Sequence, residues 1–362
     1  MKKKLRVALL YGGKSAEHEI SLISARNIFE AMDKSKYEVV PIAIDKQGRW
    51  HLDRGARLLG AADRARVDFA GAKNAAAVRP GASAAPVLSG GAPLGAIDVV
   101  FPVLHGPFGE DGTIQGLLKL ANLPFVGAGV LGSAVGMDKD VMKRLLRDAE
   151  IPIAKFLVFH RAEQNAIRFA RVKKILGLPL FVKPANLGSS VGISKVSRKD
   201  ELAPAVRLAF RYDSKIIVEE GIDGREIECS VLGNEKPVAS LPGEIVVQRE
   251  FYSYDAKYLD AQGARLEIPA RLPAGTIKEI QRTAVRAYRT LCCEGMARVD
   301  FFLRPDGRVL VNEINTIPGF TKISMYPKMW EASGLSYRRL IDRLIGLALE
   351  RARREQRLRT SK

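Results

Sequence analysis

Residues 296–315 read MARVDFFLRPDGRVLVNEIN, and this pattern predicts a β-hairpin. Two largely apolar runs, 296–303 and 308–315, flank the sequence RPDG at 304–307, which favours a turn. Because side chains alternate between the faces of a strand, one face of the hairpin should be apolar. That face would carry Val299, Phe301 and Ile314.

The other face of the hairpin gathers polar side chains. Arg298 and Asp300 share it on the first strand, and Glu313 and Asn315 share it on the second. If the turn is centred on residues 305–306, Arg298 lies opposite Glu313. Two carboxylates and an amide so close together favour a hard cation, of which Mg²⁺ is the natural choice. The alternative is a surface ion-pair cluster around Arg298.

A second candidate site precedes the hairpin, at KPANLGSSVG over residues 183–192. A strand over 180–183 would deliver Lys183 to a flexible loop rich in small residues. Backbone N–H groups and hydroxyls in such a loop can bind phosphate. The alternative is an ordinary β-hairpin with an exposed lysine.

The N-terminal part alternates strands and helices. We predict strands over 5–11, 39–44 and 97–104, with helices over 19–32 and 113–121. This order predicts an α/β fold with a parallel, Rossmann-like sheet, whose ligands lie at the carboxyl ends of the strands.

The remaining chain mixes strands and helices in an α+β manner. Further helices are expected over 138–149, 163–176, 200–210, 275–292 and 335–356. Further strands are expected over 191–196, 216–219, 226–232 and 237–241. Residues 53–95 are predicted to be an inserted surface excursion, and the polar, aromatic segment 243–265 a long functional loop.

Composition narrows the class of protein. Lys and Arg number 58 against 40 for Asp and Glu, a net charge of +18 that suits phosphate-bearing partners. No apolar run is long enough for a membrane helix, and three cysteines suggest a reduced, cytoplasmic protein.

A P-loop ending at Lys14 is excluded because position 8 is alanine. The lone GxGxxG match at 127–132 is a weak dinucleotide signal.

Several stretches in this order resemble the D-alanine–D-alanine ligases of the ATP-grasp superfamily. They are residues 12–21, 105–116, 137–139, 182–192, 251–258, 298–300 and 312–321. The resemblance implies a three-domain ATP-grasp architecture: an N-terminal substrate-binding domain (1–127, with the 53–95 insertion), a central domain (128–218) and a C-terminal catalytic domain (219–362).

The resemblance also implies a nucleotide site between the central and C-terminal domains. Its ATP contacts would be Lys139, Lys183, Ser190, Glu219, Glu220, Ile222, Glu226 and Lys257. Two Mg²⁺ ions, which Mn²⁺ can replace, would be held by Asp300, Glu313 and Asn315.

Substrate binding and catalysis are assigned in the same way. Glu17 would hold the ammonium of the first D-alanine, and Ser324 the carboxylate of the second. Arg298 and the Gly319 N–H would stabilise the oxyanion. His105 would line the first subsite. Two further residues would hydrogen-bond with Glu17 and close loops over the site: Ser189 and Tyr258.

The implied activity is ATP-dependent joining of two D-alanines through an acyl phosphate, for peptidoglycan precursor synthesis. The family implies a cytoplasmic homodimer that acts on small molecules. Two alternatives remain: a related ATP-grasp ligase for another substrate, and a protein that binds nucleic acid through its basic charge. Tyr258 and Ser324 argue against the first, and the basic tail at 351–362 has no aromatic residues for base stacking.

Overall fold

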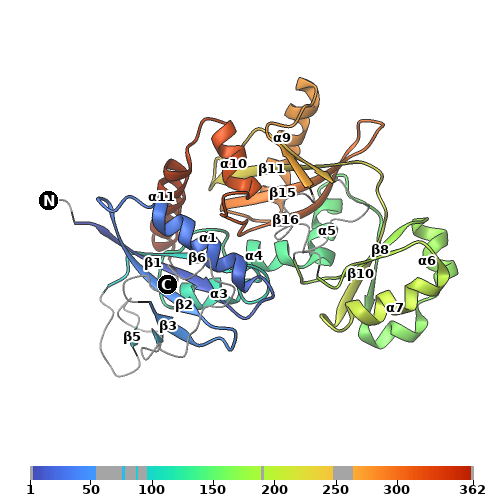
Figure 1. The fold of residues 1–362 in the computed structure, drawn as a ribbon, viewed down its shortest axis with the longest axis horizontal. Coiled ribbons are helices and arrows are strands. Elements are labelled where there is room, and N and C mark those ends of the chain that lie inside the picture. The colour runs from blue at the N-terminus through green and yellow to red at the C-terminus, as the bar shows by residue number, and fades with distance from the viewer. Residues whose placement is uncertain are drawn as a thin grey trace.

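The computed structural model describes residues 3–53, 76–77, 87–88, 96–188, 191–247 and 264–359. Three larger sheets follow one another along the chain, and helices cover their faces (Figure 1). The expected α/β fold with an α+β part is confirmed. In the described ranges no helix is long and apolar enough to cross a bilayer.

The first sheet has the strand order β3-β2-β1-β6. β1 is parallel to both β2 and β6, as the sequence predicts, while the edge strand β3 is antiparallel to β2 and was not predicted. The elements of this part are β1 (Leu5–Gly12), α1 (His18–Ala31), β2 (Tyr37–Ile44), β3 (Trp50–Leu52), β6 (Val99–Val103), α3 (Thr113–Leu120) and α4 (Val130–Met137).

Within the predicted 53–95 excursion, the structure describes Asp53 and a short antiparallel pair. It consists of β4 (Ala76–Ala77) and β5 (Val87–Leu88). The rest of that excursion lies outside the described residues, so its predicted character stays a prediction.

The second sheet, ordered β7-β10-β8-β9, is antiparallel throughout. Its elements are β7 (Phe156–His160), the 3₁₀ helix η2 (Arg161–Ala166), α6 (Phe169–Leu176), β8 (Leu180–Pro184), β9 (Ser194–Val196), α7 (Lys199–Ala209) and β10 (Lys215–Glu220). The single helix predicted over 163–176 is wrong. Arg168 has extended backbone angles and separates η2 from α6, so the apolar periodicity spans a break.

The third sheet has six strands, with β11 paired to β15 at its centre. Its elements and helices are α5 (Lys139–Asp148), β11 (Arg225–Gly233), β12 (Val238–Ala239), β13 (Gly243–Val247), β14 (Ala264–Glu267), α9 (Ala274–Thr290), β15 (Gly295–Leu303), β16 (Val309–Asn315), α10 (Met325–Ala332) and α11 (Tyr337–Gln356). The two ends of the segment predicted as a loop over 243–265 therefore belong to strands. Its middle, 248–263, lies outside the described residues.

The two ends of the chain share one hydrophobic core. α11 lies beside α1 and the first sheet, and its predicted apolar stripe is buried against them (Figure 1). The stripe consists of Leu340, Ile341, Leu344, Ile345 and Ala348. Burial of this face joins the C-terminal helix to the N-terminal sheet, and so brings loops of the two regions together.

One turn further along α11, the buried Arg351 fixes the chain where it leaves the first sheet. Its guanidinium donates to the carbonyls of Gly127 and Phe125, the latter at 2.7 Å, and lies 4.4 Å from the Phe125 ring centroid. These carbonyls would be left buried without a partner if the side chain were removed.

We therefore expect Arg351→Ala to lower the free energy of unfolding by about 2–4 kcal/mol. Urea unfolding followed by circular dichroism measures the change. Arg353→Ala, at an exposed position of the same helix, is the matched control and should cost about 0.5 kcal/mol or less. An equal loss of unfolding free energy in both variants would show that the two hydrogen bonds of Arg351 do not contribute specifically to stability.

Candidate active site

A cavity of about 740 Å³ opens between the second and third sheets, a volume suited to a nucleotide-sized ligand. Strands β8 and β10 form one wall, and β13 and β15 form the other. Most of the residues expected to bind the nucleotide or metal line it: Lys139, Lys183, Glu219, Glu220, Ile222, Glu226, Asp300 and Glu313. Residues far apart in sequence are thus brought to one cavity.

Glu219 is the most enclosed acid in this cavity, with a side chain only 3% exposed. Lys183 Nζ lies 2.5 Å from its Oε2, and Lys143 Nζ lies 2.6 Å from its Oε1. Burial alone raises the pKa of Glu219, but the two lysine charges outweigh burial and lower the pKa to about 2. Glu219 is therefore an anion held between two lysine side chains, of which burial lowers the pKa of Lys143 while Glu219 raises that of Lys183.

Lys139 reaches the same cavity from the start of α5. Its Nζ donates to the Leu187 carbonyl at 2.7 Å and lies 3.4 Å from Glu313 Oε2. The lysine thus connects the glycine- and serine-rich loop to the polar face of the hairpin. Cations at this junction suit the phosphates of a nucleotide.

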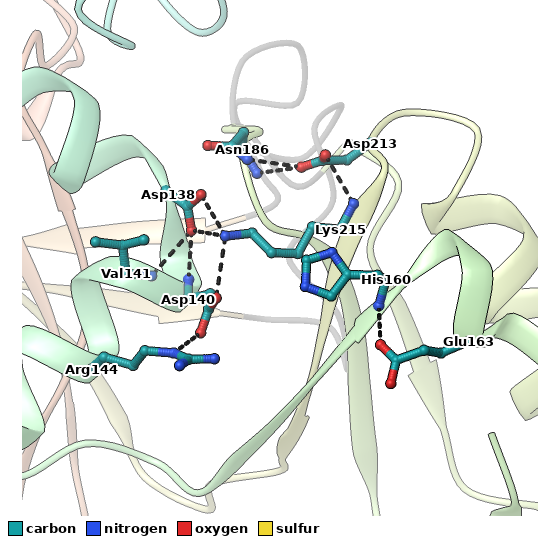
Figure 2. Close-up of polar contacts among 9 residues, drawn as sticks. All are labelled: Asp138, Asp140, Val141, Arg144, His160, Glu163, Asn186, Asp213 and Lys215. Atoms are coloured by element: carbon teal, nitrogen blue, oxygen red, sulfur yellow. Dashed lines mark hydrogen bonds and ion pairs between the residues drawn. The ribbon is translucent and has the colours of Figure 1, made fainter. Parts of the chain in front are cut away.

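A polar network ties the start of α5 and the base of that loop to the second sheet (Figure 2). Asp138 caps the N-terminus of α5, and its carboxylate forms an ion pair with the Lys215 ammonium at 2.7 Å. Asp213 accepts from the Asn186 backbone at 2.8 Å, at the foot of the loop. The second sheet and α5 are thereby tied together, which fixes the start of the helix that carries Lys139 and the start of the loop after Lys183.

The hairpin forms where the sequence predicts it, but its register differs. Asp300 pairs with Glu313, and Arg298 pairs with Asn315, rather than Arg298 with Glu313. The turn closes between Leu303 and Val309, one residue wider than expected, and a bulge at Asp300/Phe301 shifts the register further. The predicted face nevertheless survives, because the shift preserves the alternation of both strands. The predicted apolar residues on the opposite face are buried in the core: Val299, Phe301 and Ile314.

Arg298 is held between two acids. Its guanidinium donates to both Asp300 oxygens, at 2.7 and 2.6 Å, and lies 2.9 Å from Glu228 Oε2. Asn315 Nδ2 also donates to Asp300, at 3.0 Å. Glu228 was not predicted, although it follows Glu226 by the period of a strand and so shares its face.

The residue types on this face suit Mg²⁺, and both Asp300 oxygens also accept from Arg298, as the ion-pair alternative expects. Asp300 and Glu313 stand opposite each other on paired strands, and their hard oxygen atoms, with the Asn315 amide, are ligands that this ion prefers. Among the described residues there is no group of three or more His, Cys, Asp or Glu side chains placed to hold a metal. Mg²⁺ is commonly held by one or two carboxylates together with substrate phosphates, so a set of this size is sufficient.

A second group of predicted residues lies next to the cavity. Glu17 stands between two loops, since a Cβ added at Gly106 or Gly188 would lie 2.9 or 3.3 Å from its Oε2. A Cβ added at Gly319 would lie 2.8 Å from Ser324 Oγ, so the backbone passes close to that hydroxyl. Glu17 thus lies beside Gly188, which lines the cavity, and Ser324 lies beside Gly319.

His105 and Glu110 join the N-terminal glycine-rich loop to the loop after β16. The Ile317 carbonyl is 2.9 Å from His105 Nδ1, and the Ile317 N–H donates to Glu110 at 2.9 Å. Since a carbonyl can only accept, Nδ1 carries the hydrogen. Nε2 is then a buried acceptor with no hydrogen-bond partner among the described residues. Burial lowers the pKa of His105 and raises that of Glu110 to about 8.

Sequence reasoning missed Glu110 and Lys143. Glu110 lies within a glycine-rich stretch, which indicates a close approach of the backbone and not a role for this side chain. Lys143 follows Lys139 by one helical turn, which is the spacing of neighbours on one helix face. Other predicted residues lie outside the described part of the chain, and their roles stay predictions: Ser189, Ser190, Lys257 and Tyr258.

Comparison with known proteins agrees with this arrangement. Residues 6–128 match the family model for the D-ala D-ala ligase N-terminus, and residues 145–346 match the model for its C-terminus. The chain is 55% identical to the D-alanine–D-alanine ligase A of Escherichia coli (strain K12), over 99% of this chain and 100% of that protein.

Solved structures agree as well. The D-alanine-D-alanine ligase from Coxiella burnetii superposes with a TM-score of 0.86 at 43% identity, covering 98% of this chain and 97% of that one. The VanG D-Ala:D-Ser ligase from Enterococcus faecalis gives a TM-score of 0.86 at 38% identity, covering 96% and 100%. The chain therefore belongs to the D-alanine–D-alanine ligase family.

Proposed function

We propose that this chain joins two D-alanine molecules into D-alanyl-D-alanine, with ATP converted to ADP and phosphate, for peptidoglycan precursor synthesis. The observation that carries the proposal is a lysine-lined, nucleotide-sized cavity adjoining a carboxylate, Glu17, that can hold an ammonium group. The family membership supports the same reaction.

ATP would occupy the cavity between the second and third sheets. Lys139 and Lys183 would bind its phosphates, and Ser190 and Lys257 would add contacts from the loops. Adenine and ribose would lie against Glu219, Glu220, Ile222 and Glu226, all of which line the same cavity.

Asp300, Glu313 and Asn315 would hold two Mg²⁺ ions, or Mn²⁺ in their place. When bound, these ions would neutralise charge on the transferring phosphate. Arg298 would then face both the acids of the hairpin and the reacting carboxyl group.

The first D-alanine would bind with its ammonium on Glu17 and His105 at its side. Its carboxylate attacks the γ-phosphorus of ATP, the bond to the bridging oxygen breaks so that ADP leaves, and an acyl phosphate forms. The amine of the second D-alanine, whose carboxylate Ser324 would bind, attacks the acyl carbon, and phosphate leaves. Arg298 and the Gly319 N–H would stabilise the oxyanion of that step. Ser189 and Tyr258 would close over Glu17 and exclude water, which would otherwise hydrolyse the acyl phosphate.

We also propose that the chain comprises domains over 1–127, 128–218 and 219–362, and that it acts as a homodimer in the cytoplasm. Three sheets in series support the division. Free cysteines at 229, 292 and 293 suit a reducing compartment. The proposal assigns no role to nucleic acid or membrane.

Ligation in a mixture of D-alanine and D-lactate tests the proposed second substrate. We expect the dipeptide to dominate at neutral pH, because Tyr258 argues for an amine nucleophile. Mass spectrometry distinguishes the dipeptide from the depsipeptide. A predominance of D-alanyl-D-lactate would contradict the assignment.

A further inference from the structure

Lys143 is a charged side chain that the reaction above does not use. It projects from α5, is only 1% exposed, and lies 2.6 Å from Glu219. Lys183, in contrast, is 12% exposed and lines the nucleotide cavity. Both lysines therefore pair with the same carboxylate, Lys143 from within the protein and Lys183 from the surface of the cavity.

The partner of Lys183 must change when a nucleotide binds, if the proposed function holds. Phosphate oxygens compete with Glu219 for the Lys183 ammonium, because both are anionic acceptors. Without another cation, Glu219 would then be a buried, unpaired carboxylate, a situation that is strongly unfavourable. This free-energy cost would weaken nucleotide binding.

Lys143 is placed to remove that cost. Met142 and Leu146, on the same helix, are fully buried in the core of the third sheet. Asp138 caps the helix and is tied to Lys215 (Figure 2). The helix is therefore fixed at its cap and by its packing, and the Lys143 ammonium is enclosed beside Glu219, away from the cavity lining.

We propose that Lys143 is a positioning residue of the nucleotide site, the permanent counter-ion that keeps Glu219 neutralised and in place while Lys183 turns to the phosphates. This inference rests on the proposed use of ATP. It predicts that Lys143 affects nucleotide binding without touching the nucleotide, and acts only through Glu219.

Lys143→Met in the full chain tests the inference. We expect ADP affinity, measured by calorimetric titration, to fall about 10-fold or more, as for loss of one partner of a buried ion pair. The KM for ATP should rise by a similar factor, while the KM for D-alanine stays within about two-fold. Lys174→Met, at an exposed position on α6, is the matched control and should leave both constants unchanged.

A double-variant cycle separates this role from a merely structural one. Once Glu219→Gln has removed the charge that needs a counter-ion, adding Lys143→Met should have no further effect on ADP affinity. If Lys143→Met alone fails to fold, the double variant, which buries no unpaired charge, should fold and bind ADP like Glu219→Gln.

Three results would contradict the inference: unchanged ADP affinity in Lys143→Met, the same loss with and without Glu219→Gln, or a double variant that also fails to fold. Failure of the unmodified chain to bind ADP or ATP would instead contradict the proposed function. The two failures are therefore distinguishable.

Discussion

Arg298→Ala is expected to lower kcat for dipeptide formation by about 100- to 1000-fold, the usual cost of losing one oxyanion-stabilising donor. Arg298 donates to both oxygens of Asp300 and lies 2.9 Å from Glu228, so its guanidinium is held in a defined orientation. That orientation matters because negative charge develops on the acyl oxygen only in the transition state. The KM for ATP should change much less than kcat.

Arg308→Ala is the matched control, because this exposed arginine lies at the far end of the same hairpin and forms an ion pair with Asp306 of the turn. Its kcat should stay within about two-fold of the unmodified protein. Steady-state assays of both variants, with circular dichroism to verify folding, measure the difference. A folded Arg298→Ala protein with kcat within tenfold of the unmodified protein would refute the proposed role.

Glu313→Gln is expected to lower activity about 100-fold at subsaturating Mg²⁺, since losing a carboxylate shared with the metal costs on the order of 3 kcal/mol. Glu313 stands opposite Asp300 on the paired strand and faces Lys139 at 3.4 Å. Removing its charge should weaken the hold on the metal, and raising the Mg²⁺ concentration should restore part of the activity. Activity titrated against Mg²⁺ measures both effects.

Asp306→Asn removes an acid from the exposed turn of the same hairpin and serves as the control. Its Mg²⁺ dependence should match that of the unmodified protein. If Glu313→Gln and Asp306→Asn showed the same Mg²⁺ dependence, the assignment of the metal to the Asp300–Glu313 face would be wrong.

The sequence predicts those helices and strands whose apolar residues form a continuous run or recur at a regular spacing. β1, β2 and β6 are apolar runs, and the α11 stripe recurs at helical spacing, so each is visible without tertiary information. Short or interrupted elements are not visible in this way. α4 contains glycines, α10 contains Pro327, and both form mainly because packing holds them.

Within the site, strand alternation suffices to place Arg298 and Asp300 on one face. It does not give the register, because the bulge beside Asp300 depends on packing that no local pattern encodes. The buried ion pairs between acidic and basic side chains cannot be predicted from the sequence either. Lys143 has the spacing of an ordinary helix-surface lysine, and only the fold shows that this surface faces Glu219.

The proposed ligation is best tested by phosphate release from ATP in the presence of Mg²⁺, with D-alanine, L-alanine or no amino acid supplied and the product mass determined in parallel. We expect release that depends on D-alanine and is accompanied by the mass of a D-alanyl-D-alanine dipeptide. Release that is indifferent to D-alanine, or that yields no dipeptide, would contradict the proposed ligation.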